Sequence, residues 1–228
     1  GNDLNSLLQN YWMVIHPPVL FLGFASTVIP FGFAFGGLMS KEHSWTKAAL
    51  PWASFSAAVL GTGIMMGAAW AYESLSFGGY WAWDPVENAS LVPWLVMVAG
   101  LHTNLVYKST GYSLKSTYLF YILSFSLVLY SSFLTRSGIL GDTSVHAFTG
   151  ADMTGQLVSF FLIFFLPALA LYIARSKTIP TIKKEENTYS REFWMFIGSL
   201  VLFLSAIVII AKTSLTVYHK VFGKNIAT

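Results

Sequence analysis

The stretch that decides the fold is residues 77–107, which read FGGYWAWDPVENASLVPWLVMVAGLHTNLVY. Its later part, residues 86–107, is apolar and close to the roughly 20 residues that a helix needs to cross a hydrocarbon core. Its earlier part places two tryptophans and a tyrosine beside the glycine pair Gly78-Gly79. Trp and Tyr favour the membrane–water interface, and glycine lets a backbone turn sharply or approach a flat object closely. The stretch therefore predicts an aromatic loop at a membrane face, followed by a spanning helix.

Two carboxylates stand where that helix is expected to begin. Asp84 occupies the N-cap position, Pro85 the first helical position and Glu87 the third, which is the pattern of a capping box. Both carboxylates also complement the positive end of the helix dipole. We therefore predict a structural role for Asp84 and Glu87 rather than a catalytic carboxylate pair.

Five more apolar stretches of spanning length flank this one, at residues 18–39, 49–69, 116–135, 155–174 and 193–211. Hydrophobic residues make up 55% of the 228-residue chain and charged residues only 10%, whereas soluble domains carry about 25% charged residues. We predict a single membrane domain over residues 1–228, an all-α polytopic bundle of about six transmembrane helices. The one polar connector of any length, residues 176–190, is expected to be a cytoplasmic linker.

Basic residues predict the orientation of the bundle. Nine of the thirteen lie in or beside the connections that would share one face: Lys41, Lys47, Lys108, Lys115, Arg175, Lys177, Lys183, Lys184 and Arg191. The positive-inside rule assigns that face to the cytoplasm. The aromatic loop, residues 70–88, and a second loop, residues 136–154, are then expected on the outer face. The net charge of +3 reflects the inner connections and does not indicate binding to nucleic acid.

The chain contains no cysteine, so it cannot supply thiolate chemistry of its own, and stray disulfides are avoided on an oxidising outer face. Its first residues, Gly1-Asn2-Asp3, include neither an initiator methionine nor a signal sequence. We expect the sequence to be a piece of a longer protein.

Two histidines are predicted to share the outer face with Trp81 and Trp83. His16 precedes Pro17-Pro18, and because proline disfavours helix at the residue before it, we expect His16 in an extended segment above the first helix. His146 lies in the second outer loop. Two imidazoles beside an aromatic platform would suit a metalloporphyrin held from both sides. The alternatives are surface histidines and a plain interfacial aromatic belt.

The remaining ionisable candidates differ in their predicted depth. His102 falls inside the third apolar stretch, where an ionisable side chain indicates function unless it is a neutral imidazole bonded to a neighbouring helix. Arg136 begins the second outer loop and would either snorkel or pair with a carboxylate such as a haem propionate. His43, in a short inner connection, is expected to be solvated, and His219, in the outer tail, is expected to have no special role.

These residues occur in a series of motifs that resembles the WWD family of haem-handling membrane proteins, in its CcmF/NrfE-type cytochrome c haem lyase branch. The resemblance runs over nearly the whole chain. The matching pieces, in order, are Asp3-Leu4-Asn5, Leu7-Leu8-Gln9, Ile15-His16-Pro17-Pro18, Gly78–Ser90, Pro93-Trp94-Leu95, His102, Arg136-Ser137-Gly138, Ser144–Phe148 and Ser190-Arg191-Glu192. One departure is Phe77, where many members carry a further tryptophan that would add an indole donor.

The resemblance implies a set of haem contacts. His16 and His146 would ligate the iron of a haem held at the aromatic loop, which here contributes Gly78, Gly79, Tyr80, Trp81 and Trp83. His102 matches the first of two ligands of a separate, non-covalently bound b-type haem. The second ligand of the family would lie beyond Thr228, so we expect the b-type haem to be weak or absent in this chain.

The resemblance also implies a reaction and a compartment. Relatives sit in the bacterial inner membrane as multi-pass proteins with a periplasmic active face. They take haem from a haem chaperone and, with other maturation subunits, join it to the thiols of a Cys-x-x-Cys-His segment of apocytochrome c. The chain's share would be to position the haem edge. Two alternatives stay open: a haem transfer or export module that loads a haem chaperone, and a structural membrane scaffold.

Overall fold

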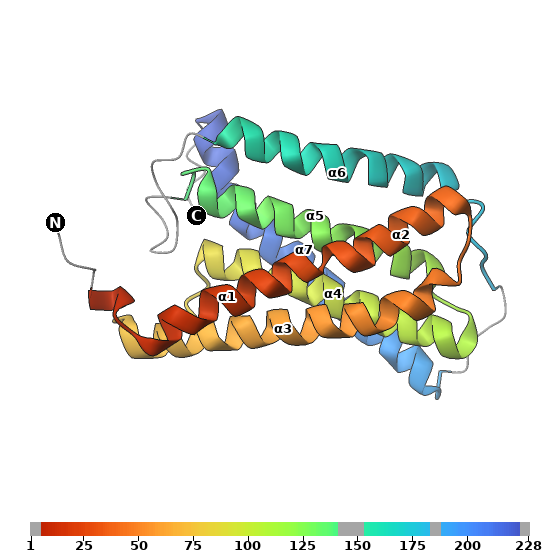
Figure 1. Cartoon of the computed structure of the whole chain (residues 1–228), viewed down its shortest axis with the longest axis horizontal. Helices are drawn as coiled ribbons and strands as arrows, with labels where there is room; N and C mark the ends of the chain where they lie inside the picture. The colour runs from red at the N-terminus through yellow and green to blue at the C-terminus, as the bar shows by residue number, and fades with distance from the viewer. Residues whose placement is uncertain (1–5, 141–152, 183–187, 224–228) are drawn as a thin grey trace.

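The computed structural model describes residues 6–140, 153–182 and 188–223, and every regular element in those ranges is helical (Figure 1). A 3₁₀ turn, η1, precedes the longer helices. The elements are η1 Ser6–Leu8, α1 Tyr11–Ser26, α2 Val28–Ser40, α3 Trp45–Ser74, α4 Pro85–Thr110, α5 Leu114–Arg136, α6 Thr154–Arg175 and α7 Arg191–Phe222.

The described ranges contain six units long and apolar enough to cross a membrane, which confirms the predicted all-α bundle. Helices α1 and α2 count as one of them, because the chain continues through Thr27 with the Phe31 amide donating to the Thr27 carbonyl at 3.3 Å. Several helices extend well past the apolar stretches. Helix α1 begins at Tyr11, and α7 reaches Phe222.

The prediction that His16 lies in an extended segment is wrong, because His16 is inside α1. The helix begins earlier, at Tyr11, and the side-chain oxygen of its N-cap residue Asn10 accepts a hydrogen bond from the Trp12 amide at 2.8 Å. Pro17 and Pro18 lie within the helix. In a membrane bundle, packing against neighbouring helices and local adjustments compensate for the backbone donors that proline lacks.

Helices α1 and α3 pack unusually closely through glycine. A Cβ added at Gly23 would lie 2.6 Å from the Leu60 Cα, and one added at Gly63 would lie 2.7 Å from the Leu20 Cα. Small residues at such contacts let two helix backbones approach each other in a membrane. The close approach brings the outer part of α1, with His16, directly against the last turns of α3.

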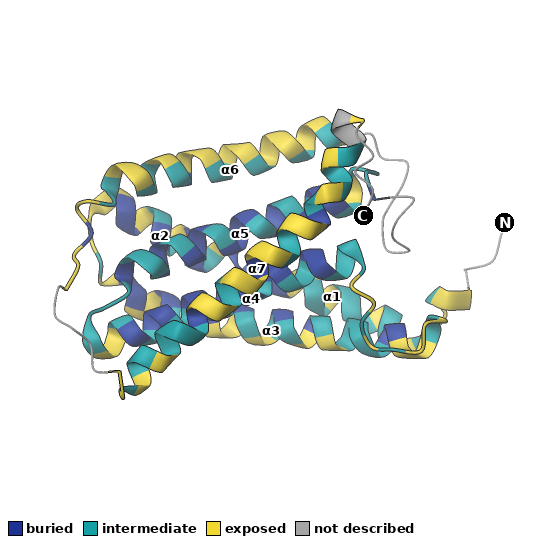
Figure 2. Ribbon diagram, turned by 180° about the vertical axis from the view of Figure 1, so that it is seen from behind, coloured by how far each residue is buried: buried dark blue, intermediate teal, exposed yellow. Residues whose placement is uncertain are grey.

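Helices α4 and α5 form the centre of the bundle, and α6 and α7 lie at its edge. Figure 2 shows the dark-blue buried surface concentrated on α4 and α5, while α6 and α7 are largely exposed. Large side chains of α4 and α5 that are fully buried include Met97, Tyr118, Tyr121 and Leu134. Helices α2, α4 and α6 end, and helices α3, α5 and α7 begin, at one end of the bundle, which we call the inner end (Figure 1). The aromatic loop between α3 and α4 lies at the opposite, outer end.

Candidate functional site

The start of α4 carries the predicted capping box. The Asp84 carboxylate accepts from the backbone amides of Val86 at 2.9 Å and Glu87 at 3.4 Å. The Glu87 carboxylate accepts in return from the Asp84 amide at 3.2 Å, and it also accepts from the Ala82 amide at 2.9 Å. Because Ala82 lies between the two tryptophans, Glu87 fixes the aromatic loop as well as the helix end.

The backbone of the aromatic loop adopts a left-handed conformation at Trp83, with φ of 59°. A bulky residue rarely holds such a conformation unless its surroundings impose it. The Asn88 amide group donates to the Trp83 carbonyl at 3.0 Å, and this bond ties the loop to the first turn of α4. The Trp83 side chain is 63% exposed as a result.

The two indoles of the loop therefore face different surroundings. Their rings meet edge to face, with centroids 6.2 Å apart and planes at 85°. Trp83 points outward, whereas Trp81 lines a small pocket between α1, α3 and α4. Tyr80 is exposed and stacks on Tyr72 of α3, with centroids 4.4 Å apart. The loop thus presents exposed rings outside and one indole inside.

His16 and Trp81 line the same pocket, although they come from different parts of the chain. The pocket has a volume of about 60 Å³, and its lining is His16, Leu20, Ile64, Gly67, Ala68, Trp70, Trp81, Val86, Glu87 and Ser90. The structure thus brings together one predicted histidine and one predicted tryptophan. It does so through α1 and α3 rather than through two facing loops.

The His16 ring is held in a defined orientation. Its Nδ1 lies 2.8 Å from the carbonyl oxygen of Gly63. Because a carbonyl can only accept, Nδ1 must carry the proton, and Nε2 of the neutral ring then carries the basic lone pair. The ring also packs against Gly67, where an added Cβ would lie 2.7 Å from the histidine Cε1. A histidine that ligates a metal commonly has its other ring nitrogen fixed in this way.

Trp81 carries a buried donor that no described residue pairs. Its indole nitrogen is buried and has no hydrogen-bond partner among the residues that the structure describes. Buried donors are nearly always paired in native proteins, so each exception calls for an explanation. A ligand atom that accepts from this N–H would provide one.

Four residues that the sequence analysis did not single out hold the outer ends of α1 and α3 together: Asn10, Trp12, Trp70 and Glu73. The Glu73 carboxylate accepts from the Asn10 side chain at 2.9 Å and from the Trp12 indole at 3.0 Å. The Trp70 indole donates to the Leu7 carbonyl at 3.0 Å. The sequence signal for this group was the pair of tryptophans, Trp12 and Trp70, expected near the outer membrane interface, since a buried indole N–H usually donates to a partner.

Arg136 and His146 are not among the residues that line this pocket. The Arg136 guanidinium, at the end of α5, lies over the Phe21 ring at 5.7 Å from its centroid, a cation–π contact. His146 and most of the second loop lie outside the described residues.

His102 lies within α4, the helix that packs against α7. Ser109 of α4 contacts Glu192 of α7 through a hydrogen bond of 3.3 Å, and the two helices run antiparallel. The Nδ1 atom of His102 is buried and has no partner within the described ranges. The alternative reading, a hydrogen bond to a neighbouring helix, is therefore not met at this atom by any described residue.

His43 and His219 do not lie where the sequence predicted them. The His43 Nδ1 is 2.8 Å from the Tyr118 hydroxyl, which also accepts from the Trp45 indole at 2.7 Å. His43 is therefore partly buried at the inner end rather than solvated. His219 lies in the last turns of α7 rather than in an outer tail, with a buried Nε2 that no described residue pairs. A long-range contact, invisible in the local sequence, accounts for the position of His43, and the extension of α7 to Phe222 accounts for that of His219.

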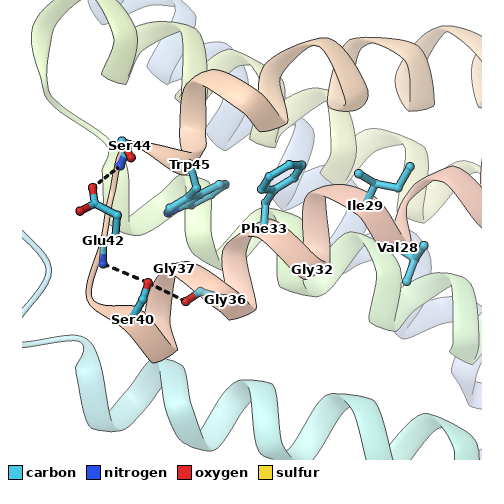
Figure 3. A pocket seen from close by; sticks show the side chains of 10 residues that line it. All are labelled: Val28, Ile29, Gly32, Phe33, Gly36, Gly37, Ser40, Glu42, Ser44 and Trp45. Carbon is cyan, nitrogen blue, oxygen red and sulfur yellow. Dashed lines mark hydrogen bonds between the residues drawn. The ribbon is translucent and has the colours of Figure 1, made fainter.

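A larger hollow lies at the inner end and is separate from the aromatic loop. Figure 3 shows this pocket of about 550 Å³ between α2 and the start of α3. Ser40 donates to the Gly36 carbonyl at 2.9 Å and accepts from the Glu42 amide at 3.3 Å at one end of it. Its lining includes no histidine: Val28, Ile29, Gly32, Phe33, Gly36, Gly37, Ser40, Glu42, Ser44 and Trp45.

The chain is similar in sequence to proteins of cytochrome c biogenesis. The family profile described as Cytochrome C assembly protein matches residues 1–140. The cytochrome c-type biogenesis protein CcmF of Pseudomonas fluorescens is 39% identical over 217 residues, which cover 93% of this chain and 32% of that protein. CcmF of Escherichia coli (strain K12) is 35% identical over 98% of this chain and 34% of its own length. The biogenesis protein NrfE of Haemophilus influenzae is 39% identical over 75% of this chain and 27% of its own.

A solved structure is similar in fold as well. The structure named cytochrome c heme lyase CcmF superposes with a TM-score of 0.73 and 28% sequence identity, and the match covers 92% of this chain and 32% of that one. The chain thus spans about a third of the length of the relatives that it matches.

Proposed function

This chain belongs to the family of cytochrome c assembly proteins, and from that premise we propose that its outer face holds haem during cytochrome c maturation. The observation that carries the proposal is the shared pocket of His16 and Trp81. It combines an imidazole of fixed tautomer with a buried indole N–H that lacks a partner among the described residues. The relatives named as biogenesis proteins and as a haem lyase support the same role.

The donor set fits haem, although the pocket cannot enclose it. Imidazole nitrogen is a common axial ligand of haem iron, and the tautomer of His16 directs Nε2 to that role. Pockets that enclose ligands of this size have roughly 300–1,000 Å³, whereas this one has about 60 Å³. We infer that His16 would hold the haem from the pocket side and that exposed rings of the loop, such as Trp83 and Tyr80, would contact it from outside.

His146 is the second proposed ligand of this haem, and Arg136 is a proposed partner for a propionate. When bound, the haem would supply the vinyl carbons to which two thiols add. Because the chain contains no cysteine, both thiols come from the substrate, an apocytochrome c segment with the Cys-x-x-Cys-His pattern. Gly78 and Gly79 leave the loop backbone open to such an approach. The role of the chain is to bind, orient and expose the haem edge.

We infer a multi-pass protein of the bacterial inner membrane whose outer end faces the periplasm, in agreement with the basic residues gathered at the inner end. A haem chaperone that delivers haem and further maturation subunits are its proposed partners. His102 is proposed as one imidazole ligand of a separate, non-covalently held b-type haem, because its buried Nδ1 lacks a partner within the described residues.

Absorption spectroscopy of protein purified from haem-supplied membranes tests the proposal. We expect a low-spin bis-imidazole spectrum that the double change His16→Ala and His146→Ala removes. His43→Ala at the inner end is the matched control and should retain the spectrum. The proposal fails if the double variant, shown by thermal unfolding to be folded, keeps the wild-type spectrum. Any signal lost separately on His102→Ala reports the b-type haem.

A thioether assay with an apocytochrome c peptide separates the two haem-handling functions. Covalent haem on the peptide supports the lyase reaction. Transfer of non-covalent haem to a chaperone without thioether formation would instead support an export module. A chain that binds no haem under full supply would leave only a scaffold role.

A further inference from the structure

A second cavity, of about 330 Å³, lies at the inner end of the bundle between the start of α3 and the end of α4. It is far in the chain and in the fold from the aromatic loop, which stands at the opposite ends of the same two helices (Figure 1). The cavity is lined by Thr46, Lys47, Leu50, Asn104, Tyr107, Lys108 and Gly111.

Two lysines from different helices converge on this cavity. Lys47 is in the first turn of α3, and Lys108 is in the last turn of α4. Both are exposed, and among the residues that the structure describes neither amino group forms an ion pair or a hydrogen bond. Two ammonium groups on one cavity repel each other, so an anion between them would lower the energy of both.

The ends of α3 and α4 act differently on the charges of the two lysines. The negative end of α4 favours Lys108, but Lys47 stands at the positive end of α3, where a cation is unfavourable. The N-cap residue of α3, Ser44, makes no side-chain capping bond. The charge at the α3 side of the cavity is therefore uncompensated by its own helix, and it attracts a negative group from outside.

The floor of the cavity is rigid and already formed. Asn104 is 1% exposed, and its amide group donates to the Thr46 carbonyl at 3.1 Å and to the Tyr121 hydroxyl at 2.9 Å. These bonds join α3, α4 and α5 below the two lysines. A ligand would thus enter a preformed site rather than order one, which reduces the entropic cost of binding.

The depth of the cavity indicates the kind of anion. Both lysines lie at helix ends that carry the basic face of the bundle, where lipid headgroups meet spanning helices. Leu50 lies one turn deeper than Lys47 and gives the cavity an apolar wall toward the membrane interior. A phosphate attached to acyl chains matches both the charged mouth and this wall, whereas a free phosphate uses only the mouth.

We propose that this cavity binds the phosphate of an anionic phospholipid through Lys47 and Lys108. The bound lipid holds the inner ends of α3 and α4 together. The site is independent of the haem proposal, because it shares no residue with the outer pocket.

Lipid binding to the purified protein tests the site. Phosphatidylglycerol added to detergent-solubilised protein should raise the melting temperature, while phosphatidylcholine and inorganic phosphate should not. The phosphatidylglycerol affinity should fall about fivefold for each lysine removed, and therefore roughly 30-fold in the double variant Lys47→Gln, Lys108→Gln. High salt should weaken the wild-type effect.

The control variant Lys41→Gln, Lys177→Gln removes the same charge from two exposed lysines of the same face, outside the cavity. It should keep the wild-type affinity. The site is refuted if both double variants bind phosphatidylglycerol alike. The lipid assignment is refuted if inorganic phosphate raises the melting temperature as much as phosphatidylglycerol does.

Discussion

His16 of α1 and Gly63 of α3 lie 47 residues apart in the chain, and a hydrogen bond of 2.8 Å joins the imidazole to the Gly63 carbonyl. The bond sets which ring nitrogen carries the proton, so the tautomer of a proposed iron ligand depends on a neighbouring helix. Gly63 can offer its carbonyl at this distance because the α1 and α3 backbones touch there without an intervening side chain. The contact between α1 and α3 therefore sets the tautomer of the proposed iron ligand His16.

Gly67→Ala should disturb this arrangement directly. The new methyl group would lie 2.7 Å from the His16 Cε1, so the ring must turn away, at a cost of about 1–3 kcal/mol in stability. Haem occupancy, measured by pyridine haemochrome per chain, should fall. Gly36→Ala is the control, because nothing lies within 4 Å of its added Cβ. Equal haem content in the two variants would contradict the placement of His16.

Trp81→Phe removes a buried N–H that has no partner within the described residues. An unsatisfied buried donor destabilises a fold, so the haem-free variant should be as stable as wild type or more stable, by up to about 1 kcal/mol. Its haem affinity should nevertheless fall, because the indole no longer donates to the ligand. Thermal unfolding and haem titration measure the two effects. Trp83→Phe, at an exposed ring, should change stability by less than about 0.5 kcal/mol.

Asp84→Ala should remove the N-cap of α4 and cost about 0.5–2 kcal/mol of stability. Asp84→Asn keeps a side-chain oxygen that can accept from the Val86 amide, so it should lose much less. Thermal unfolding in detergent compares the two. Activity lost in Asp84→Asn without a change in melting temperature would point to a direct chemical role for the carboxylate and would contradict the structural one.

Glu42, in the connection between α2 and α3, should make stability depend on acid pH. The backbone amide of Ser44 and, less strongly, the Ser44 side chain and the His43 amide hold the pKa of Glu42 below its ordinary value of 4.5. A carboxylate with a lowered folded pKa stabilises the fold above its unfolded pKa and loses that contribution as pH falls through the folded pKa. The melting-temperature difference between wild type and Glu42→Gln should therefore shrink below about pH 4.5. A difference that stays constant down to pH 3 would contradict this account.

Much of the fold could be predicted because it depends on local composition. The six spans follow from apolar stretches of the length that a bilayer requires, and the cap of α4 follows from Asp84, Pro85 and Glu87 in adjacent positions. Helix ends were predicted less well, as α1 shows. Proline rules describe an isolated chain, and at Pro17 packing against α3 outweighs them.

The sequence by itself determined the membrane bundle, the capped helix and the aromatic loop, since each depends on residues close together in the chain. Only the tertiary structure decided that His16 contacts Gly63 and shares a pocket with Trp81, that Trp81 turns inward while Trp83 turns outward, and that Lys47 and Lys108 share one cavity. These arrangements bring together residues from different parts of the chain. Their formation depends on how closely the helix backbones approach, which glycines such as Gly63 allow but no local pattern specifies.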